Sequence, residues 1–366
     1  MSTDPTRPPR RVTIARNDDL YEAFPDICLL PSGKLLCLYR EADVHVASMS
    51  RVVLAESDDR GRSWTNFRTF DRPRTYAEHR SVWNAPRIGL LPDGRVLANF
   101  DAFVFPDEAD DWNWPQSRTC NHTFLWFSED EGRTWSDPQL TEVQGICPDK
   151  VRVLDDRHWL MVSSHWSIRF PGAFRVHAAH SFDGGRTWPL SALVAEQDGL
   201  QHDEPSVVRL PDRRLLCVMR ENVHTTRPSH YVLSEDEGRT WSTPRPAPFH
   251  ADRPAAGVLH GGRLLVTYRN VEPAPDERTM RKGRNPGTWA WLGDLAGLTG
   301  EGGESRFLEL EHDSCESPGD YGYSGWVQFD DGEIFCVYHH RDTAPHSYIC
   351  GCWFREEHFT ERPTSA

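Results

Sequence analysis

The sequence predicts an all-β protein, a single-domain six-bladed β-propeller over residues 1–366 with four-stranded antiparallel blades. Three observations predict this fold class. One turn pattern occurs four times, a second hairpin pattern occurs six times, and 27 Pro with 26 Gly mark many tight turns. Repeats spaced by tens of residues are typical of arrays in which each unit buries its apolar face against its neighbours. Residues 1–19 are expected to form an N-terminal tail.

The turn pattern is Ser-x-Asp-x-Gly-Arg-Ser/Thr-Trp. Its copies begin at Ser57, Ser128, Ser181 and Ser234, and strand-like sequence such as TFLWF precedes them. The Asp carboxylate can accept hydrogen bonds from backbone N–H groups further along the turn, and the Gly supplies a positive φ. The Trp then opens the next strand with a large apolar face. Each copy therefore predicts a β-hairpin turn with a structural role.

The second pattern is a hairpin that aligns on a Pro and on a turn eight residues later. Its copies are FPDICLLPSGKLLCLYRE, APRIGLLPDGRVLANFDA, CPDKVRVLDDRHWLMVSS, EPSVVRLPDRRLLCVMRE, RPAAGVLHGGRLLVTYRN and YSGWVQFDDGEIFCVYHH. Six such hairpins, each followed by two further strands, are what six blades require. The fifth blade has WAWLGDLAGLTG in place of the turn motif, and the sixth ends in SYICGCWF.

Equivalent positions of the six hairpins should form rings around the central channel, because the first strand of each blade lies nearest the axis. The position before the Pro column holds Phe24, Ala85, Cys147, Glu204, Arg253 and Tyr323. The end of the second strand holds Arg40, Asp101, Ser163, Arg220, Arg269 and His339. Both rings are expected on one rim, with the Asp-containing turns on the opposite rim. So much charge around a narrow axis predicts either a self-satisfied ion network or a polar pocket that attracts anions.

Composition narrows the function classes. The formal charge of −14 disfavours nucleic acid as a partner. The N-terminal residues lack the apolar core of a secretory signal and no apolar run is long enough to span a membrane, so we expect a cytoplasmic protein with no membrane partner. Nine Cys, several within apolar strands, imply no disulfide framework. We expect no metal and no cofactor, since paired ligand spacing and phosphate-binding Gly loops are missing. The sequence does not indicate the oligomeric state.

With these residues the chain resembles the sialidases, six-bladed propellers whose Asp-box motif is the turn found here four times. In that family a Glu opens an E-P-x-V strand and an Arg follows sixteen residues later, as Glu204 and Arg220 do here. A Y-S pair opening the last inner strand carries the family's Tyr nucleophile, which places that role on Tyr323. The resemblance also implies an Arg from blade five in a carboxylate clamp, matched best by Arg284, with Arg281 and Arg278 as competitors.

Two departures from the family pattern concern the clamp and the general acid. Ala23 stands where sialidases have their first clamping Arg, so Arg40 or Arg253 would have to replace it. The acid of the family is an Asp in the loop before the first Asp box. Here that loop offers Asp43, with His45 nearby, and Asp101 or Asp26 are further acids expected on the rim. The substrate-binding set predicted around them also includes Arg269 and His339.

The function predicted on this basis is a sialidase-like exo-glycoside hydrolase acting on an acidic oligosaccharide or glycoconjugate, with Glu204 as the base that activates Tyr323. One alternative keeps the fold and pairs Glu204 with Asp101 or Asp26 as ordinary carboxylates on a neutral or uronic sugar, as in arabinan hydrolysis. Others are a polysaccharide lyase and a non-catalytic carbohydrate-binding propeller that stacks sugars on Trp83, Trp112, Trp114, Trp166 or Trp326. The long insertions over 101–120 and 270–289 are expected to set substrate choice.

Overall fold

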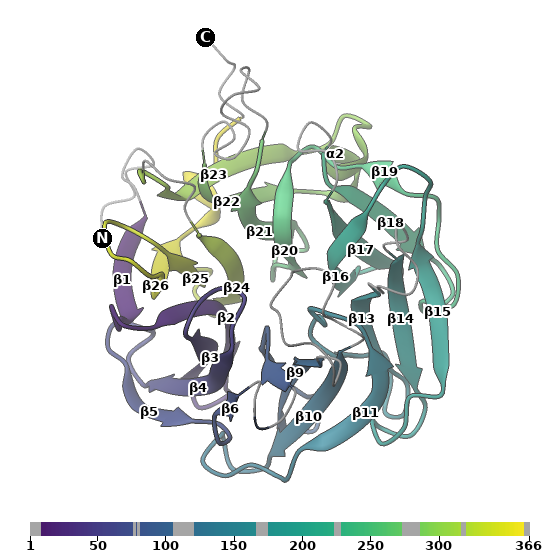
Figure 1. Cartoon of the computed structure of the whole chain (residues 1–366). Coiled ribbons are helices and arrows are strands. Elements are labelled where there is room, and N and C mark those ends of the chain that lie inside the picture. The colour runs from purple at the N-terminus through teal and green to yellow at the C-terminus, as the bar shows by residue number, and fades with distance from the viewer. Residues whose placement is uncertain are drawn as a thin grey trace.

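Six antiparallel sheets stand around a common axis, and the first strand of each sheet lies nearest that axis (Figure 1). The computed structural model describes residues 9–75, 78, 81–104, 121–165, 175–222, 228–272, 286–315 and 320–361. The prediction of an all-β six-bladed propeller is confirmed. Within the described ranges, no helix is long and apolar enough to cross a membrane.

Blades one to five are each built from one continuous stretch of the chain. Blade one contains β2 (Tyr21–Leu29), β3 (Leu35–Ala42), β4 (Met49–Ser57), β5 (Thr65–Thr69) and the short β6 (Arg74–Thr75). Blade two contains β7 (Ser81–Trp83), β8 (Arg87–Leu90), β9 (Val96–Val104), β10 (His122–Ser128) and β11 (Gln139–Gln144). Blade three contains β12 (Arg152–Val153), β13 (Trp159–His165), β14 (Arg175–Ser181) and β15 (Leu190–Ala195). Blade four contains β16 (His202–Arg209), β17 (Leu215–Glu221), β18 (His230–Ser234) and β19 (Arg245–Pro246). Blade five contains β20 (Ala251–Val258), β21 (Leu264–Asn270), β22 (Gly287–Gly293) and β23 (Ser305–His312).

Blade six is completed by the N-terminal end of the chain. Its strands β24 (Gly322–Gln328), β25 (Ile334–His340) and β26 (Tyr348–Phe354) are followed by an outer strand, β1 (Arg10–Ala15), which pairs antiparallel with β26. The expectation of a tail over residues 1–19 is therefore wrong for residues 10–15. Ile14 is buried in a core shared with blade one. Pairing the two ends of the chain in one sheet covers an edge that would otherwise be open.

The four Asp boxes share one hydrogen-bond pattern. In the first, Ser57 Oγ donates to Asp59 Oδ1 at 2.9 Å, and Asp59 accepts from the backbone N–H and the hydroxyl of Ser63. Gly61 has φ +87°, and a Cβ there would lie 2.7 Å from a ring carbon of Phe335 in the neighbouring blade. The glycine is thus required by both the turn and the interblade contact. In blade five a short helix, α2 (Leu295–Thr299), capped by Asp294, replaces the box.

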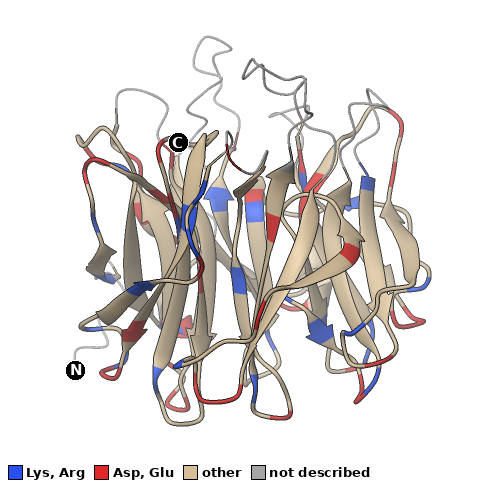
Figure 2. Ribbon diagram, turned by 60° about the horizontal axis from the view of Figure 1, so that its bottom comes forward, with Lys and Arg blue, Asp and Glu red and all other residues tan. Residues whose placement is uncertain are grey.

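The two faces of the propeller differ. Leu35 pairs with Ser57, so the β2–β3 turn and the first Asp box lie on the same face, here called the turn face. The opposite face, the loop face, carries the connections from the second to the third strands. Ala23 pairs with Arg40 at that end of blade one. The predicted separation of the two rings from the Asp-containing turns is confirmed. In Figure 2 acidic residues are seen at most of the turns along the lower edge, which is the turn face.

The apolar core lies between adjacent blades. In one such layer Phe100 and Trp126 stack with ring centroids 4.1 Å apart, and Trp83 is fully buried against both. The indole of Trp326 packs on Gly257, where a Cβ would come within 2.5 Å of the ring. Trp83 and Trp326 therefore belong to blade packing. Trp112, Trp114 and Trp166 lie outside the described residues, as do most of the two long insertions.

Candidate active site

A backbone irregularity near the start of the inner strands aims side chains into the channel at the loop face. Five residues of the ring before the Pro column have positive φ values of 46° to 58°: Phe24, Cys147, Glu204, Arg253 and Tyr323. The register of four inner strands shifts at the same point. A left-handed conformation costs a residue with a side chain about 1–3 kcal/mol, and such strain is concentrated at functional sites. This ring is called the bulge ring below.

Tyr323 and Glu204 meet across the channel from blades six and four. The Tyr323 hydroxyl donates a hydrogen bond to Glu204 Oε1. Arg220 Nη1 lies 3.1 Å from Glu204 Oε2 and 3.3 Å from the Tyr323 hydroxyl oxygen. The backbone N–H of Arg253 donates to Glu204 Oε2 at 3.0 Å. The sequence-predicted nucleophile and base are thus in direct contact, and an arginine bridges them.

The electrostatic environment of this pair keeps one proton on the tyrosine and a charge on the glutamate. Burial raises the pKa of Tyr323 well above its ordinary value, and the charge of Glu204 acts in the same direction. Burial alone would raise the pKa of Glu204, but Arg220, Arg253 and the Tyr323 hydrogen bond hold it below the ordinary value. At neutral pH the pair is therefore a protonated phenol hydrogen-bonded to a carboxylate that can accept its proton.

Two aspartates that the sequence analysis missed hold the arginines around Tyr323. Asp252 Oδ1 lies 2.8 Å from Arg220 Nε, and Asp320 Oδ1 accepts from Arg269 Nη2 at 2.7 Å. The Arg269 guanidinium carbon lies 4.5 Å from the centre of the Tyr323 ring. Asp252 immediately precedes the bulge ring, a position that also holds an Asp in blade four, so the repeat alignment carried this signal. Asp320 lies in the loop before β24 and has no repeat equivalent.

Arg40 and Asp101 lie on the blade one and blade two side of the channel and are both fully buried. Arg40 donates to the backbone oxygen of His45 at 2.7 Å and to Asn84 Oδ1 at 3.4 Å. Asp101 Oδ2 accepts from the amides of Asn84 and Asn121. Burial raises the pKa of Asp101, while those two amides act against it. The ring of Phe24 separates Arg40 from Tyr323, since it contacts the Arg40 guanidinium at 4.5 Å and the Tyr323 ring at 5.0 Å.

Arg253 and His339 also serve the architecture of the channel. The Arg253 guanidinium donates to the backbone oxygens of Cys147 and Pro148, which joins blade five to blade three. His339 Nε2 lies 3.1 Å from Asp320 Oδ1, and burial lowers its pKa to about 4 although Asp320 opposes that shift. His339 therefore positions Asp320, and Arg253 ties blade five to blade three beside Glu204. Neither was recognisable as a positioning residue from the sequence alone.

The two loop residues considered for the general acid have different surroundings. The Asp43 carboxylate accepts hydrogen bonds from the backbone N–H groups of Val44, Ser48 and Met49 and from the Ser48 hydroxyl, so it closes its own loop. His45 is 48% exposed and its Nδ1 lies 2.6 Å from Asp320 Oδ2. Its ring contacts Phe24, with centroids 5.5 Å apart. Of these two, His45 stands in contact with the cluster around Tyr323.

Asp26 lies deeper in the channel than the sequence suggested. Its carboxylate is fully buried, accepts from the backbone N–H of Ile88 at 2.9 Å and lies 3.0 Å from Lys150 Nζ. The equivalent residues of blades three and four act similarly: Asp149 accepts from Val207 N–H and Ser206 from Ala256 N–H. These three side chains are called the staple ring, and they join blade one to blade two, blade three to blade four and blade four to blade five. Arg284, Arg281 and Arg278 lie outside the described residues.

Six closed blades, four of them with Asp boxes, and a Tyr–Glu pair among arginines define the class of sialidase-like propellers. Residues 78–336 match the family described as "BNR repeat-like domain". This match covers more than half of the chain, and the chain belongs to that family.

Individual relatives are distant. A sialidase of Micromonospora viridifaciens is 23% identical over 222 residues, which cover 55% of this chain and 33% of that protein. The chain thus spans about a third of the curated relative it matches. A mutant of NanB sialidase from Streptococcus pneumoniae superposes with a TM-score of 0.67 at 14% identity, covering 98% of this chain and 73% of that one. An α-L-arabinanase from Penicillium chrysogenum, complexed with arabinobiose, gives 0.63 at 13% identity, covering 94% and 97%. At these identities the structural likenesses show the fold alone.

Proposed function

We propose that the protein is an exo-glycoside hydrolase of sialidase type that acts on an acidic sugar, with Tyr323 as nucleophile and Glu204 as its base. The observation that carries this proposal is the hydrogen bond from the Tyr323 hydroxyl to Glu204, with Arg220 Nη1 3.3 Å from the phenol oxygen. A phenol is a weak nucleophile at neutral pH, and an adjacent base removes that barrier. The flanking arginine stabilises the phenolate as it develops.

In the proposed first step the Tyr323 oxygen attacks the anomeric carbon while its proton passes to Glu204. The glycosidic C–O bond breaks, and the leaving oxygen takes a proton from a general acid. In the second step water attacks the anomeric carbon of the glycosyl-tyrosine and gives a proton to the deprotonated general acid, which restores that acid. The bond between the anomeric carbon and the Tyr323 oxygen breaks, Glu204 returns its proton to the tyrosine, and the free sugar leaves. Glu204 thus accepts the tyrosine proton in the first step and returns it in the second, a role that requires it to be ionised at the start.

The substrate proposed is a sugar that carries a carboxylate. Support comes from Arg220 and Arg269, which flank Tyr323 and are each oriented by an aspartate, Asp252 and Asp320 respectively. Arginine suits this role because its planar fork binds a carboxylate through two parallel hydrogen bonds. We also propose that one of Arg284, Arg281 and Arg278 is a third arginine that binds the substrate carboxylate. Ala23 is fully buried, and Phe24 beside it contributes an apolar wall to the site.

His45 is proposed as the proton donor in preference to Asp43. Its support is its exposure, its pairing with Asp320 and its contact with Phe24, which itself packs on Tyr323. Asp43, by contrast, is engaged by four groups of its own loop. A general acid matters most for a poor leaving group. His45→Asn should therefore slow hydrolysis of a natural disaccharide far more than that of an activated aryl glycoside, whereas equal effects on both would contradict the assignment.

The experiment compares wild type, Tyr323→Phe and Glu204→Gln on aryl glycosides that include the sialoside, the glucuronide and the arabinofuranoside. We expect turnover of an acidic glycoside, with kcat lowered about 10²–10⁴-fold by either change. Tyr338→Phe is the matched control, because its hydroxyl contacts Glu311 outside the site. A fluorinated analogue of the preferred sugar should label Tyr323 covalently, as detected by peptide mass spectrometry.

Other outcomes would redirect the assignment. Turnover that survives Tyr323→Phe but not Glu204→Gln would contradict the tyrosine nucleophile and favour a carboxylate pair, as considered for an arabinan or a uronic sugar. A product with a double bond would instead identify a lyase. Binding of an acidic sugar without turnover of any glycoside in the panel would refute the enzyme proposal and leave a carbohydrate-binding propeller.

A further inference from the structure

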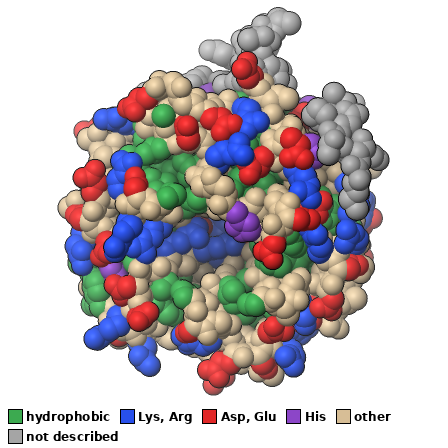
Figure 3. Space-filling view, turned by 180° about the vertical axis from the view of Figure 1, so that it is seen from behind, with side chains coloured by type: hydrophobic (Ala, Val, Ile, Leu, Met, Phe, Trp, Pro, Cys, Tyr) green, Lys and Arg blue, Asp and Glu red, His purple; other side chains and the backbone are tan. Residues whose placement is uncertain are grey.

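The turn face of the propeller has its own opening, at the end of the channel opposite to the Tyr–Glu pair. Figure 3 shows a hollow at the centre of this face, in which Lys and Arg side chains gather. A cavity of about 360 Å³ lies there, and its cationic lining consists of Arg87, Lys150, Arg152 and Arg209. An adjoining cavity of about 370 Å³ shares Lys150 and Arg152 and is otherwise mostly apolar. We call the first the turn-face cavity.

The charge of the turn-face cavity opposes that of the whole chain. Its lining contains four cationic side chains and two carboxylates, Asp26 and Asp149, so the local excess is 4 − 2 = 2 positive charges. The chain as a whole carries −14. The turns that surround the opening carry acidic residues together with lysines and arginines (Figure 2). The cavity is therefore more basic than the chain as a whole, and neutralisation of Asp26 and Asp149 alone would need only two cations.

Arg87 is a buried cation whose hydrogen bonds are incomplete. Its side chain is 3% exposed, and its Nη1 donates to the backbone oxygen of Ser324. Its nearest carboxylate oxygens, on Asp26 and Asp149, lie 3.8 and 3.9 Å away, beyond hydrogen-bond reach. Nε and Nη2 have no hydrogen-bond partner among the described residues. Burial lowers the pKa of Arg87, and Arg253 acts in the same direction, so a further anion nearby would stabilise this cation.

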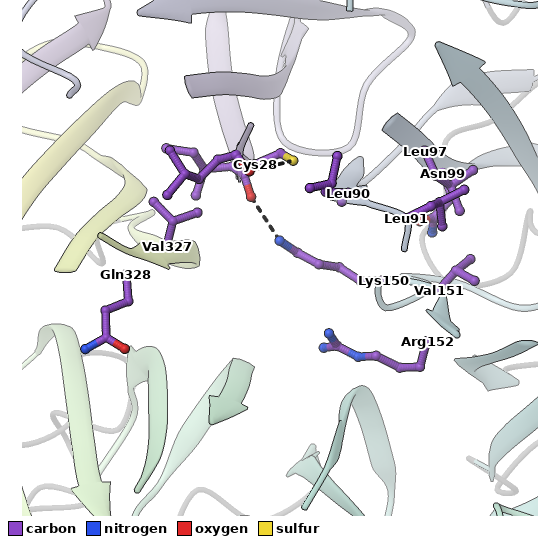
Figure 4. Close-up of a pocket in the computed structure, with 13 residues that line it drawn as sticks. Cys28, Leu90, Leu91, Leu97, Asn99, Lys150, Val151, Arg152, Val327 and Gln328 are labelled. Carbon is purple, nitrogen blue, oxygen red and sulfur yellow. Dashed lines mark hydrogen bonds between the residues drawn. The ribbon is translucent and has the colours of Figure 1, made fainter. Parts of the chain in front are cut away.

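Lys150 and Arg152 form the solvent-accessible part of the cationic lining. They are two residues apart, and in Figure 4 both side chains extend into the open space between Leu90 and Gln328. Lys150 Nζ donates to Ile27 O at 3.0 Å, and Arg152 Nε donates to Val207 O at 2.7 Å. Their side chains are 23% and 26% exposed, so a solute that enters the hollow can reach them. Arg209, held by Leu154 O, completes the lining from blade four.

From this geometry we propose that the turn-face cavity binds a phosphate group, either inorganic phosphate or the phosphate of a small organic ester. Phosphate near neutral pH carries between one and two negative charges, which matches the local excess of two. Its oxygens can accept from Lys150, Arg152 and Arg209 together, and Arg87 supplies a fixed charge beneath them. The adjoining cavity, lined by apolar side chains such as Leu29, Leu90 and Val327, has room for the organic part of an ester.

Isothermal titration calorimetry of the intact protein with inorganic phosphate and with glycerol 3-phosphate tests the proposal, with acetate at equal ionic strength as the comparison. We expect phosphate or the ester to bind, and Arg152→Gln and Arg209→Gln each to weaken that binding at least tenfold. Arg209→Gln leaves the contacts of Asp26 and Asp149 intact and is the safer variant for folding. Arg95→Gln is the matched control, since Arg95 pairs with Asp93 on the same face outside both cavities.

The outcomes are distinct from those of the glycosidase proposal, because binding is read without turnover. Tenfold tighter binding of the ester supports an organic phosphate as the ligand, and equal affinities support inorganic phosphate. Affinity unchanged in both Arg152→Gln and Arg209→Gln would place any bound phosphate elsewhere and overturn the proposal. Failure of both ligands to bind at millimolar concentration, or acetate binding as tightly as phosphate, would overturn it as well.

Discussion

Replacement of Asp26 separates a structural role in the channel from a role in chemistry. Asp26→Ala leaves the buried N–H of Ile88 without its acceptor, which costs about 1–3 kcal/mol. The same change removes the partner of Lys150, 3.0 Å away. Breaking a fully buried ion pair costs about 3–5 kcal/mol, and we take about 2 kcal/mol here because water can reach the 23% exposed lysine. The expected loss of unfolding free energy is therefore about 3–5 kcal/mol.

Asp26→Asn retains an oxygen for Ile88 N–H and removes only the charge, so we expect a smaller loss of about 2 kcal/mol. Urea unfolding followed by Trp fluorescence gives the midpoint and the slope from which both losses are obtained. Asp93→Asn, at a carboxylate that is 50% exposed in a turn, is the control and should change stability by less than about 0.5 kcal/mol. If Asp26→Ala left the urea midpoint unaltered but abolished glycoside turnover, the structural role of Asp26 would be refuted. Asp26 would then again be a candidate catalytic residue.

Two further predictions concern the Asp boxes. Gly238→Ala should destabilise the protein by at least about 2 kcal/mol, because Gly238 has φ +89° and the new Cβ would lie 2.4 Å from Leu160 Cδ1. Gly184→Ala, with φ +73° but open space around it, should cost only about 1 kcal/mol, and equal midpoints for the two variants in urea would contradict this reasoning. Hydrogen bonds from the turn lower the pKa of Asp59, Asp130 and Asp183 to about 2. The contribution of these carboxylates to stability is thus fully present above the unfolded pKa near 4 and is lost as the pH falls toward 2. In thermal unfolding between pH 5 and 2, the melting temperature of Asp130→Asn should therefore fall less steeply with pH than that of wild type.

The repeats made the fold and the bulge ring predictable. Five of the six hairpins place a Pro and a turn at fixed spacing, and the sixth has Ser324 in place of the Pro, so the column that contains Glu204 and Tyr323 is visible in the sequence. The closing strand β1 was missed because its partner β26 lies over 300 residues away along the chain and no local pattern marks the pairing. The strand Arg10–Ala15 is also short, with six residues, and begins with two arginines, so its sequence resembles that of a solvated tail.

Asp252 was missed for a backbone reason. In a regular strand, adjacent side chains point to opposite faces, so the residue before the bulge ring should point away from the channel. Positive φ at Arg253 breaks that alternation, and Asp252 reaches Arg220 while Arg253 reaches the opposite wall of the channel. Residues with side chains seldom adopt this conformation, so the strand pattern of blade five does not predict it, and only the matching Asp of blade four in the repeat alignment pointed to this position. Asp320 has no repeat equivalent, and its approach to His45, Arg269 and His339 depends on tertiary structure.

The bulge also explains how one inner strand can supply a candidate catalytic residue and a contact to the next blade. Two residues along a strand span about 7 Å, so Glu204 and Ser206 occupy different layers of the channel. Glu204 faces Tyr323 at the loop face, while Ser206 accepts from Ala256 N–H in the staple ring below. The neighbouring blade also holds the backbone at the bulge ring, since the Glu204 N–H donates to Ser164 Oγ of blade three at 2.7 Å. Substitutions in the staple ring should therefore lower stability, whereas Glu204→Gln and Tyr323→Phe should lower turnover in a protein that still closes.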